Sequence, residues 1–308
     1  MKLVFSAEVK KHKEKGLPIL ALESTILAHG MPYPENYTFA KKAENICRMK
    51  KVAPAIIAIL EGKVHVGLEE KNLKKVCQST NILKASQRDI SFIVAKKKDG
   101  ATTVSATSWI TYKSGVSVFA TGGIGGVHKN STNTFDVSQD ITTLATNPIV
   151  VVSAGAKAIL DLPKTIESLE THGVPVFGYK TFNLPSFYSR NSGIKIDRKV
   201  DNAKDIAKIY HEHKNLGIKS SLLIMNPVPK ENEIPKKTIN IVIQKAIDKS
   251  KALNIKGKEL TPFLLKTIVK ETGGKSLKTN VALAINNIEL GTKIAHQISI
   301  RDKLTTIK

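Results

Sequence analysis

The sequence predicts a layered α/β domain, in which helices cover both faces of a mostly parallel β-sheet. Short apolar runs rich in β-branched residues alternate along the chain with stretches of helical periodicity. Several of these runs are apolar at every position, which is typical of strands that are buried on both faces. A chain of 308 residues with 41% hydrophobic and 24% charged residues is also long enough to bury a sizeable core.

The expected strands are short apolar runs bounded by polar or turn-forming residues. They are Pro18–Leu22, Ala55–Leu60, Val64–Val66, Ser91–Ala95, Val116–Ala120, Ile149–Ser153, Val174–Gly178 and Leu222–Met225. Amphipathic stretches lie between them. In Phe39–Cys47 and in Ala203–Tyr210 the apolar side chains recur at helical spacing, so both stretches are predicted to be helices.

The C-terminal third, from about Pro235, is expected to be nearly all helical. Thr261-Pro262 indicates an N-cap followed by proline at the first helical position, and Gly273-Gly274 indicates the end of that helix. Ser276 is then expected to cap a final helix that runs to about Ala295. We expect this helical third to pack on the α/β body, because no Pro/Gly/Ser-rich linker separates the two parts.

The chain therefore reads as one domain over residues 1–308, with residues 1–16 as a basic N-terminal helix or extension. No internal repeat is present, and no apolar run approaches the roughly 20 residues of a membrane helix. The start of the chain has no apolar stretch long enough for a secretory signal. The cysteines, Cys47 and Cys77, are too few for a disulfide framework or a four-ligand zinc site. We expect a soluble, cytoplasmic protein.

The charge balance is strongly basic. Lysine and arginine number 48 against 26 acidic residues, which gives a formal net charge of +22. Such a charge favours acidic partners, which are nucleic acids, anionic membranes or phosphorylated metabolites. Five of the basic residues are arginine, the usual reader of bases and phosphates, and the lysines are spread over the whole length. We therefore favour a lysine-rich solvated surface over a nucleic-acid-binding surface.

Ligands of open α/β sheets bind beyond the carboxyl ends of the strands, and three of the expected strands end in unusual residues. The first strand ends in Glu23 and is followed by an irregular loop, His29–Pro34. A partly desolvated carboxyl at this position has a raised pKa and can act as a general acid. The alternative is that Glu23 caps a helix or pairs with a lysine.

The second strand runs into a glycine-rich loop, Gly122–Gly126, and then into His128. Its backbone N–H groups can turn onto an anion, although the spacing fits neither a Walker A loop nor a dinucleotide-binding loop. The alternative is a tight turn, with His128 as an ordinary loop residue in place of an acid or base. Farther on, Asp136, Ser138 and Asp140 can hold a divalent cation, or form an N-cap cluster.

The third strand is followed by Lys157, which lies among alanines and Gly155. Burial lowers the pKa of an ammonium group and yields a free amine that can attack a carbonyl. The alternative is a lysine whose tip reaches the surface. Lys84 can neutralise a phosphate or be a surface lysine. Together these residues indicate a phosphorylated, carbonyl-bearing or sugar substrate, without naming a reaction.

A longer set of motifs runs in order and without large gaps from about residue 18 to 297. The motifs are Ala21–Ile26, His29–Pro34, Pro54-Ala55, Val66–Leu68, Gly100–Val104, Val118–His128, Thr134–Asp140, Ala154–Lys157, Asn226-Pro227, Thr261–Leu265, Thr272–Gly274 and Asn286-Asn287. In order and spacing they resemble the pseudouridine-5′-phosphate glycosidases, which are also called the indigoidine synthase A-like family.

The resemblance implies reversible cleavage of the C–C glycosidic bond of pseudouridine 5′-phosphate to uracil and ribose 5-phosphate. It implies a divalent metal, usually Mn²⁺, and a homotrimer of α/β/α subunits, with a pseudouridine kinase on a separate chain as pathway partner. Lys157 matches the lysine that forms a Schiff base with the sugar, Glu23 the proton donor, and Asp136 the metal ligand. The expected substrate contacts are Lys84, Val104, Ser138, Gln139, Asp140, His128 and Asn280.

An iminium on Lys157 is chemically reasonable for this reaction, because a C-glycoside has no leaving heteroatom and needs an electron sink at C1′. The route differs from the two-carboxylate route of ordinary glycosidases. The chain departs from the family pattern at Gln87, Gln139 and Lys129-Asn130. Two alternatives remain, which are another Schiff-base lyase acting on a sugar phosphate and a nucleic-acid-binding protein with a degenerate enzyme fold.

Overall fold

The computed structural model describes residues 2–129, 131–255, 257 and 260–306. Its strands are β1 (Leu3–Phe5), β2 (Ile19–Leu22), β3 (Ala53–Leu60), β4 (Lys63–Val66), β5 (Leu83–Ala85), β6 (Gly100–Thr102), β7 (Val118–Ala120), β8 (Val150–Ser153), β9 (Val176–Tyr179), β10 (Lys199–Val200) and β11 (Leu222–Met225). Its α-helices are α1 (Ala7–Glu14), α2 (Thr25–His29), α3 (Glu35–Met49), α4 (Glu70–Gln78), α5 (Ile90–Ala95), α6 (Val104–Ser114), α7 (Ser131–Thr134), α8 (Gln139–Leu144), α9 (Leu162–Thr171), α10 (Ala203–Asn215), α11 (Lys236–Ala252), α12 (Leu260–Glu271) and α13 (Lys275–Thr306).

One sheet organises the molecule. Its strands lie in the order β1-β4-β3-β2-β7-β8-β11-β9-β10, with β6 paired to β3 and β5 paired to β6. From β3 across to β10 all neighbouring strands are parallel. The chain moves from β2 outward to β3, whereas it moves from β7 in the opposite direction to β8. The sheet therefore changes winding direction between β2 and β7, which is where open α/β folds bind their ligands.

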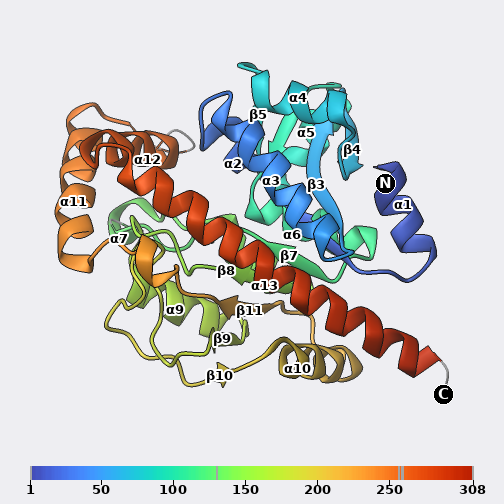
Figure 1. Ribbon diagram of the computed structural model, residues 1–308. Coiled ribbons are helices and arrows are strands. Elements are labelled where there is room, and N and C mark those ends of the chain that lie inside the picture. Colours follow the sequence, from blue (N-terminus) through green and yellow to red (C-terminus); the bar gives the residue numbers. More distant parts are fainter. Residues whose placement is uncertain (1, 130, 256, 258–259, 307–308) are drawn as a thin grey trace.

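Burial on both faces explains why the central strands are apolar throughout. Every residue of β3, β8 and β11 is buried. The long helix α13 crosses one face in front of β7 and β8, and α6 lies behind the sheet (Figure 1). A Cβ placed on Gly291 of α13 would lie 2.8 Å from Leu20 Cδ1, so the glycine permits the close approach of this helix to β2.

The predicted fold class is confirmed, and most predicted strands are present within one or two residues of their expected ends. The prediction of a strand at Ser91–Ala95 is wrong, because this segment is helix α5. Ser86 and Asp89 form a capping box directly before it, and Ile90 and Ile93 are buried one turn apart. The short strands β1, β5, β6 and β10 were not predicted, and β1 precedes α1 in the expected N-terminal helix or extension.

The helical C-terminal third is also confirmed, with corrections at the helix ends. The expected N-cap Thr261 lies inside α12, which includes Leu260, and Ser276 lies inside α13, which begins at Lys275. The last helix continues to Thr306, well beyond the expected end near Ala295. Its final turns return to the N-terminal part of the chain, where the Ser299 hydroxyl donates to the carbonyl of Gly16 at 2.8 Å.

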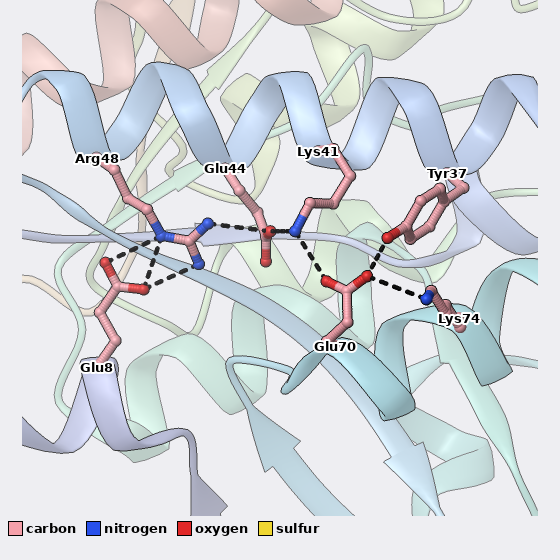
Figure 2. A network of polar contacts seen from close by, with 7 residues as sticks. All are labelled: Glu8, Tyr37, Lys41, Glu44, Arg48, Glu70 and Lys74. Carbon is pink, nitrogen blue, oxygen red and sulfur yellow. Dashed lines mark hydrogen bonds and ion pairs between the residues drawn. The ribbon is translucent and has the colours of Figure 1, made fainter.

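A network of charged side chains fixes α3, the helix that follows the loop His29–Pro34 (Figure 2). Glu44 is 4% exposed and accepts from Arg48 at 3.2 Å and from Lys41 at 3.3 Å. Arg48 also binds Glu8 of α1 at 3.0 Å, and Lys41 binds Glu70 of α4 at 2.8 Å. The network therefore joins α1, α3 and α4.

Both cysteines are free thiols in buried positions. Within the described ranges, no helix is long and apolar enough to cross a membrane.

Candidate active site

The carboxyl ends of β2, β7 and β8 lie side by side, because these strands are parallel neighbours. They open into a cleft of about 540 Å³. All the residues that the sequence singled out contribute to its lining: Glu23, Lys84, Val104, His128, Asp136, Ser138, Gln139, Asp140, Lys157 and Asn280. The three strand ends identified from the sequence therefore form one site, and the residues come from both halves of the chain.

Glu23 follows β2 and accepts a hydrogen bond from the hydroxyl of Thr121 at the end of β7. Burial raises the pKa of the Glu23 carboxyl, although the charge of Lys157 and the hydrogen bond from Thr121 act in the opposite direction. Apolar residues of β2, α2, α3 and α13 line a small void of about 20 Å³ beside it, so one side of the carboxyl faces apolar groups. Ser24, and not Glu23, stands at the N-cap of α2.

The glycine-rich loop serves close packing. A Cβ on Gly125 would lie 2.2 Å from Ser138 Oγ, and a Cβ on Gly123 would lie 2.5 Å from the ring of Phe187. The amide of Gly125 donates to Asp140 at 2.7 Å, and that of Ile124 donates to the carbonyl of Gly155 at 3.1 Å. Because two of the loop's N–H groups are used within the protein and its glycines allow close packing, the structure favours the tight-turn interpretation over an anion-binding loop.

Asp140 is a structural anchor at the wall of the cleft. Its two carboxylate oxygens accept from the backbone amides of Ser105 at 2.9 Å and Gly125 at 2.7 Å, and the side chain is 5% exposed. Ser138 caps α8 by accepting from the amide of Asp140 at 3.2 Å. The N-cap interpretation therefore holds for Ser138, and Asp140 joins the starts of α6 and α8 to the glycine-rich loop.

Asp136 presents its carboxylate to the cleft, 3.9 Å from His128 Nε2. Across the part of the chain that the structure describes, no group of three or more His, Cys, Asp or Glu side chains is arranged to hold a metal. Asp136 as one carboxylate ligand fits a hard divalent cation that keeps most of its water ligands, and does not fit a cation held by a cage of protein groups.

His128 is half-buried, and this burial lowers the pKa of its imidazole, with further lowering by the charges of Lys157 and Lys84. Asp136 opposes the shift. The imidazole is therefore neutral near pH 7, and it can accept or donate a proton within the cleft.

Lys157 lies just past β8, where its backbone amide donates to Ile124 at 3.0 Å and its half-buried side chain lines the cleft. Lys84 projects from β5, and its charge acts on Glu23, His29 and His128. Two lysines and a carboxyl whose pKa is raised by burial thus share the site. Val104 is the first residue of α6, so the N-terminus of that helix also reaches the cleft.

Asn280 enters the cleft from α13. Its Oδ1 atom is buried and accepts no hydrogen bond from any described residue. A buried acceptor without a donor is costly unless a ligand supplies one. The same helix brings this side chain within reach of the glycine-rich loop, since Oδ1 lies 3.4 Å from where a Cβ on Gly122 would be.

Two residues at the site were given no role by the sequence reasoning. Thr121 directly follows β7 and lies inside the motif Val118–His128, and Phe187, which covers Gly123, lies outside every motif. Gln87 and Gln139, at which the chain departs from the family pattern, both connect the turn after β5 to α8. Gln139 accepts from the amide of Arg88 at 3.2 Å, and Gln87 accepts from the hydroxyl of Thr143 at 2.8 Å. Asn130, another departure, lies outside the described residues.

Comparison with known proteins places this site in a family. The sequence matches the family model described as "Indigoidine synthase A like protein" over residues 8–297. The chain belongs to the indigoidine synthase A-like family. It is 48% identical over 297 residues to the pseudouridine-5′-phosphate glycosidase of Geobacillus kaustophilus, covering 96% of this chain and 99% of the relative. It is 45% identical to the enzyme of that name from Staphylococcus aureus, covering 94% and 95%.

Two solved structures show the same fold. The indigoidine synthase A-like protein of Thermotoga maritima superposes with a TM-score of 0.89 at 37% identity, over 96% of both chains. The prealnumycin C-glycosynthase AlnA, solved in complex with ribulose 5-phosphate, superposes with a TM-score of 0.90 at 29% identity, over 98% of both chains.

Proposed function

We propose that this member of the indigoidine synthase A-like family is a pseudouridine-5′-phosphate glycosidase, which reversibly converts pseudouridine 5′-phosphate and water to uracil and ribose 5-phosphate. Relatives of that name are 44–48% identical over nearly the full chain. The observation that carries the proposal is the presence of Glu23 and Lys157 in one cleft, where burial raises the pKa of the carboxyl.

Glu23 is the proton donor in this reaction. Cleavage of the C1′–C5 bond leaves an electron pair on C5 of uracil, and that carbon must receive a proton. A carboxyl with an ordinary pKa is ionised at neutral pH, whereas burial raises the pKa of Glu23 and so favours the protonated form that can act as a donor. The Thr121 hydroxyl donates to one oxygen and leaves the other free to carry this proton.

Lys157 is the nucleophile. Its amine displaces the ring oxygen at C1′, and the sugar opens. The nitrogen lone pair then forms the C1′=N bond as the C1′–C5 bond breaks, and Glu23 protonates the released uracil carbon. Water hydrolyses the resulting iminium, which frees ribose 5-phosphate and restores the amine. The neutral His128 is placed to move protons during ring opening and hydrolysis.

The polar groups around the cleft match the two ends of the substrate. Lys84 supplies positive charge for the phosphate, and Val104 begins α6, whose first amides are suited to an anion. The buried Oδ1 of Asn280 suits an N–H of uracil. Asp140 fixes the wall between these two regions, and Gln139 and Ser138 line it.

The proposal includes Mn²⁺ held by Asp136, with water completing its coordination. The ion would order water and polar groups near the base. It also includes a homotrimer, a cytoplasmic location and a pseudouridine kinase on a separate chain, all supported by the family resemblance.

The test is uracil release from pseudouridine 5′-phosphate, compared with uridine 5′-phosphate and with pseudouridine. Turnover of the first compound alone is expected, because Glu23 serves a carbon leaving group and Lys84 a phosphate. Turnover of other sugar phosphates, with no uracil released from pseudouridine 5′-phosphate, would instead identify a different Schiff-base lyase.

A further inference from the structure

A pair of buried asparagines connects the last helix to the strand ends of the site. Asn287 of α13 is 0% exposed, and its side-chain amide donates to the carbonyls of Thr121 at 2.8 Å and Gly122 at 3.4 Å. Its Oδ1 accepts from Asn226 at 3.0 Å. The side chain of Asn287 thus bonds to two backbone carbonyls and to Asn226, and it makes no bond toward the cleft.

Asn226 extends the connection to the neighbouring strands. It follows β11, is 5% exposed, and its backbone amide donates to the carbonyl of Ser153 at the end of β8 at 2.8 Å. Its side chain also donates to the carbonyl of Asn286 at 3.3 Å. The ends of β7, β8 and β11 are therefore held to α13 by one buried pair, close to the residues that carry the proposed chemistry.

We infer that Asn287 is a positioning residue, which holds the backbone of Thr121 so that the threonine hydroxyl donates to Glu23. The inference rests on the proposed function only in naming Glu23 as the acid. Asn287 does not line the cleft; it acts through Thr121.

The geometry explains how the effect is transmitted. The amide of Thr121 donates to the carbonyl of Val152 at 3.0 Å, and its carbonyl accepts from Asn287. With both backbone groups fixed, the direction of the hydroxyl depends on a single torsion, which is stiff in a β-branched side chain. Without Asn287 the carbonyl of Thr121 loses its donor, and this peptide unit is held only by the neighbouring bonds of the Thr121 amide and the Gly122 carbonyl.

Other charges near Glu23 stay in place when Asn287 changes. They are Lys157 past β8, Lys84 of β5 and Asp140 of α8. The hydrogen bond from Thr121 lowers the pKa of the carboxyl against the effect of burial. Disturbing Thr121 therefore raises the pKa of Glu23 further. Loss of the lysine charges would also raise this pKa, but Asn287→Ala leaves both lysines in place.

The experiment compares Asn287→Ala with Asn286→Ala. Asn286 is the adjacent residue, and its side chain donates to the carbonyl of Pro227 at 3.0 Å, so each variant loses one asparagine and a bond to backbone. The intensity of the infrared band of the protonated carboxyl is measured as a function of pH in each variant. The same variant carrying Glu23→Gln supplies the background, so that the difference reports the titration of Glu23. Asn287→Ala is expected to titrate at higher pH than the wild type, and Asn286→Ala at the wild-type pH.

A double-variant cycle separates positioning from general loosening. Thr121→Val removes the hydroxyl, so adding Asn287→Ala to it should shift the titration no further. A shift that adds in full, or an Asn287→Ala protein that titrates as the wild type does, overturns the inference. If Asn287→Ala does not fold, Asn226→Ala removes the donor to Asn287 Oδ1 and so loosens the Asn287 side chain. This variant should shift the Glu23 titration to higher pH by less than is expected of Asn287→Ala. An unchanged titration there also overturns the inference.

Activity supplies a second readout. In Asn287→Ala, kcat should fall about tenfold, a part of what a general acid contributes, while KM stays within about twofold. The alkaline limb of the kcat profile should move to higher pH, because the acid with the higher pKa keeps its proton longer. The infrared titration needs no turnover, so a protein that releases no uracil refutes the proposed function while Asn287 is still tested.

Discussion

Replacing Gly125 by alanine tests whether the glycine-rich loop is a packing device. The added Cβ would lie 2.2 Å from Ser138 Oγ and 2.7 Å from Asp140 Oδ2. Both atoms already have roles, since Ser138 caps α8 and Asp140 binds the amide of Gly125. Overpacking costs about 1–3 kcal/mol, and weakening the charged hydrogen bond adds about 1.5 kcal/mol, so we expect a loss of about 3 kcal/mol in the free energy of unfolding.

The matched control is Gly122→Ala in the same loop, where the nearest atom to an added Cβ is Asn280 Oδ1 at 3.4 Å. Urea unfolding followed by circular dichroism should show a change within about 0.5 kcal/mol for this control. KM of Gly125→Ala should also rise, because Asp140 holds the amide of Ser105 at the start of α6. Equal stability of the two variants would refute the packing role of the loop.

Three further outcomes follow from the site and its surroundings. Glu23→Gln should lower kcat by about 100- to 10,000-fold. Because burial raises the folded-state pKa of Glu23, the wild type loses stability as pH rises from the ordinary glutamate pKa through that raised value, and Glu23→Gln should remove this loss in thermal unfolding measured against pH. Asn280→Ala should raise KM for pseudouridine 5′-phosphate about tenfold, which steady-state kinetics would detect, because a buried acceptor for the base is lost. Glu44→Gln should cost about 1 kcal/mol in urea unfolding without changing uracil release, because Lys41 and Arg48 keep access to water.

Sequence patterns alone predict the central strands of the sheet and place candidate site residues after the carboxyl ends of these strands. Continuous apolar runs mark strands buried on both faces, and the polar residue that follows such a run marks the ligand edge, as at Glu23 and Lys157. The strand prediction at Ser91–Ala95 is wrong because a short apolar run suits either a strand or a buried helix. The Ser86–Asp89 capping box is the feature that distinguishes the two. The shortest strands carry too few residues to show any period.

Connections made by tertiary contact could not be predicted. Asp136 and Asp140 are four residues apart and look like a ligand pair, yet the amides of Ser105 and Gly125 occupy Asp140 and leave Asp136 facing the cleft. Likewise, Asn287 meets Thr121 across 166 residues, so the local sequence of neither residue indicates their contact. Such roles depend on which backbone groups the fold leaves in need of a partner.

The most direct test of the proposed chemistry is borohydride trapping during turnover of pseudouridine 5′-phosphate, followed by mass mapping of the adduct. The structure and the family resemblance predict a reduced ribose-phosphate adduct on Lys157, and no uracil release by a folded Lys157→Ala protein. Lys164→Ala, which changes an exposed lysine on α9, should behave as the wild type. Full activity in Lys157→Ala, or an adduct on Lys84 in place of Lys157, would contradict the account.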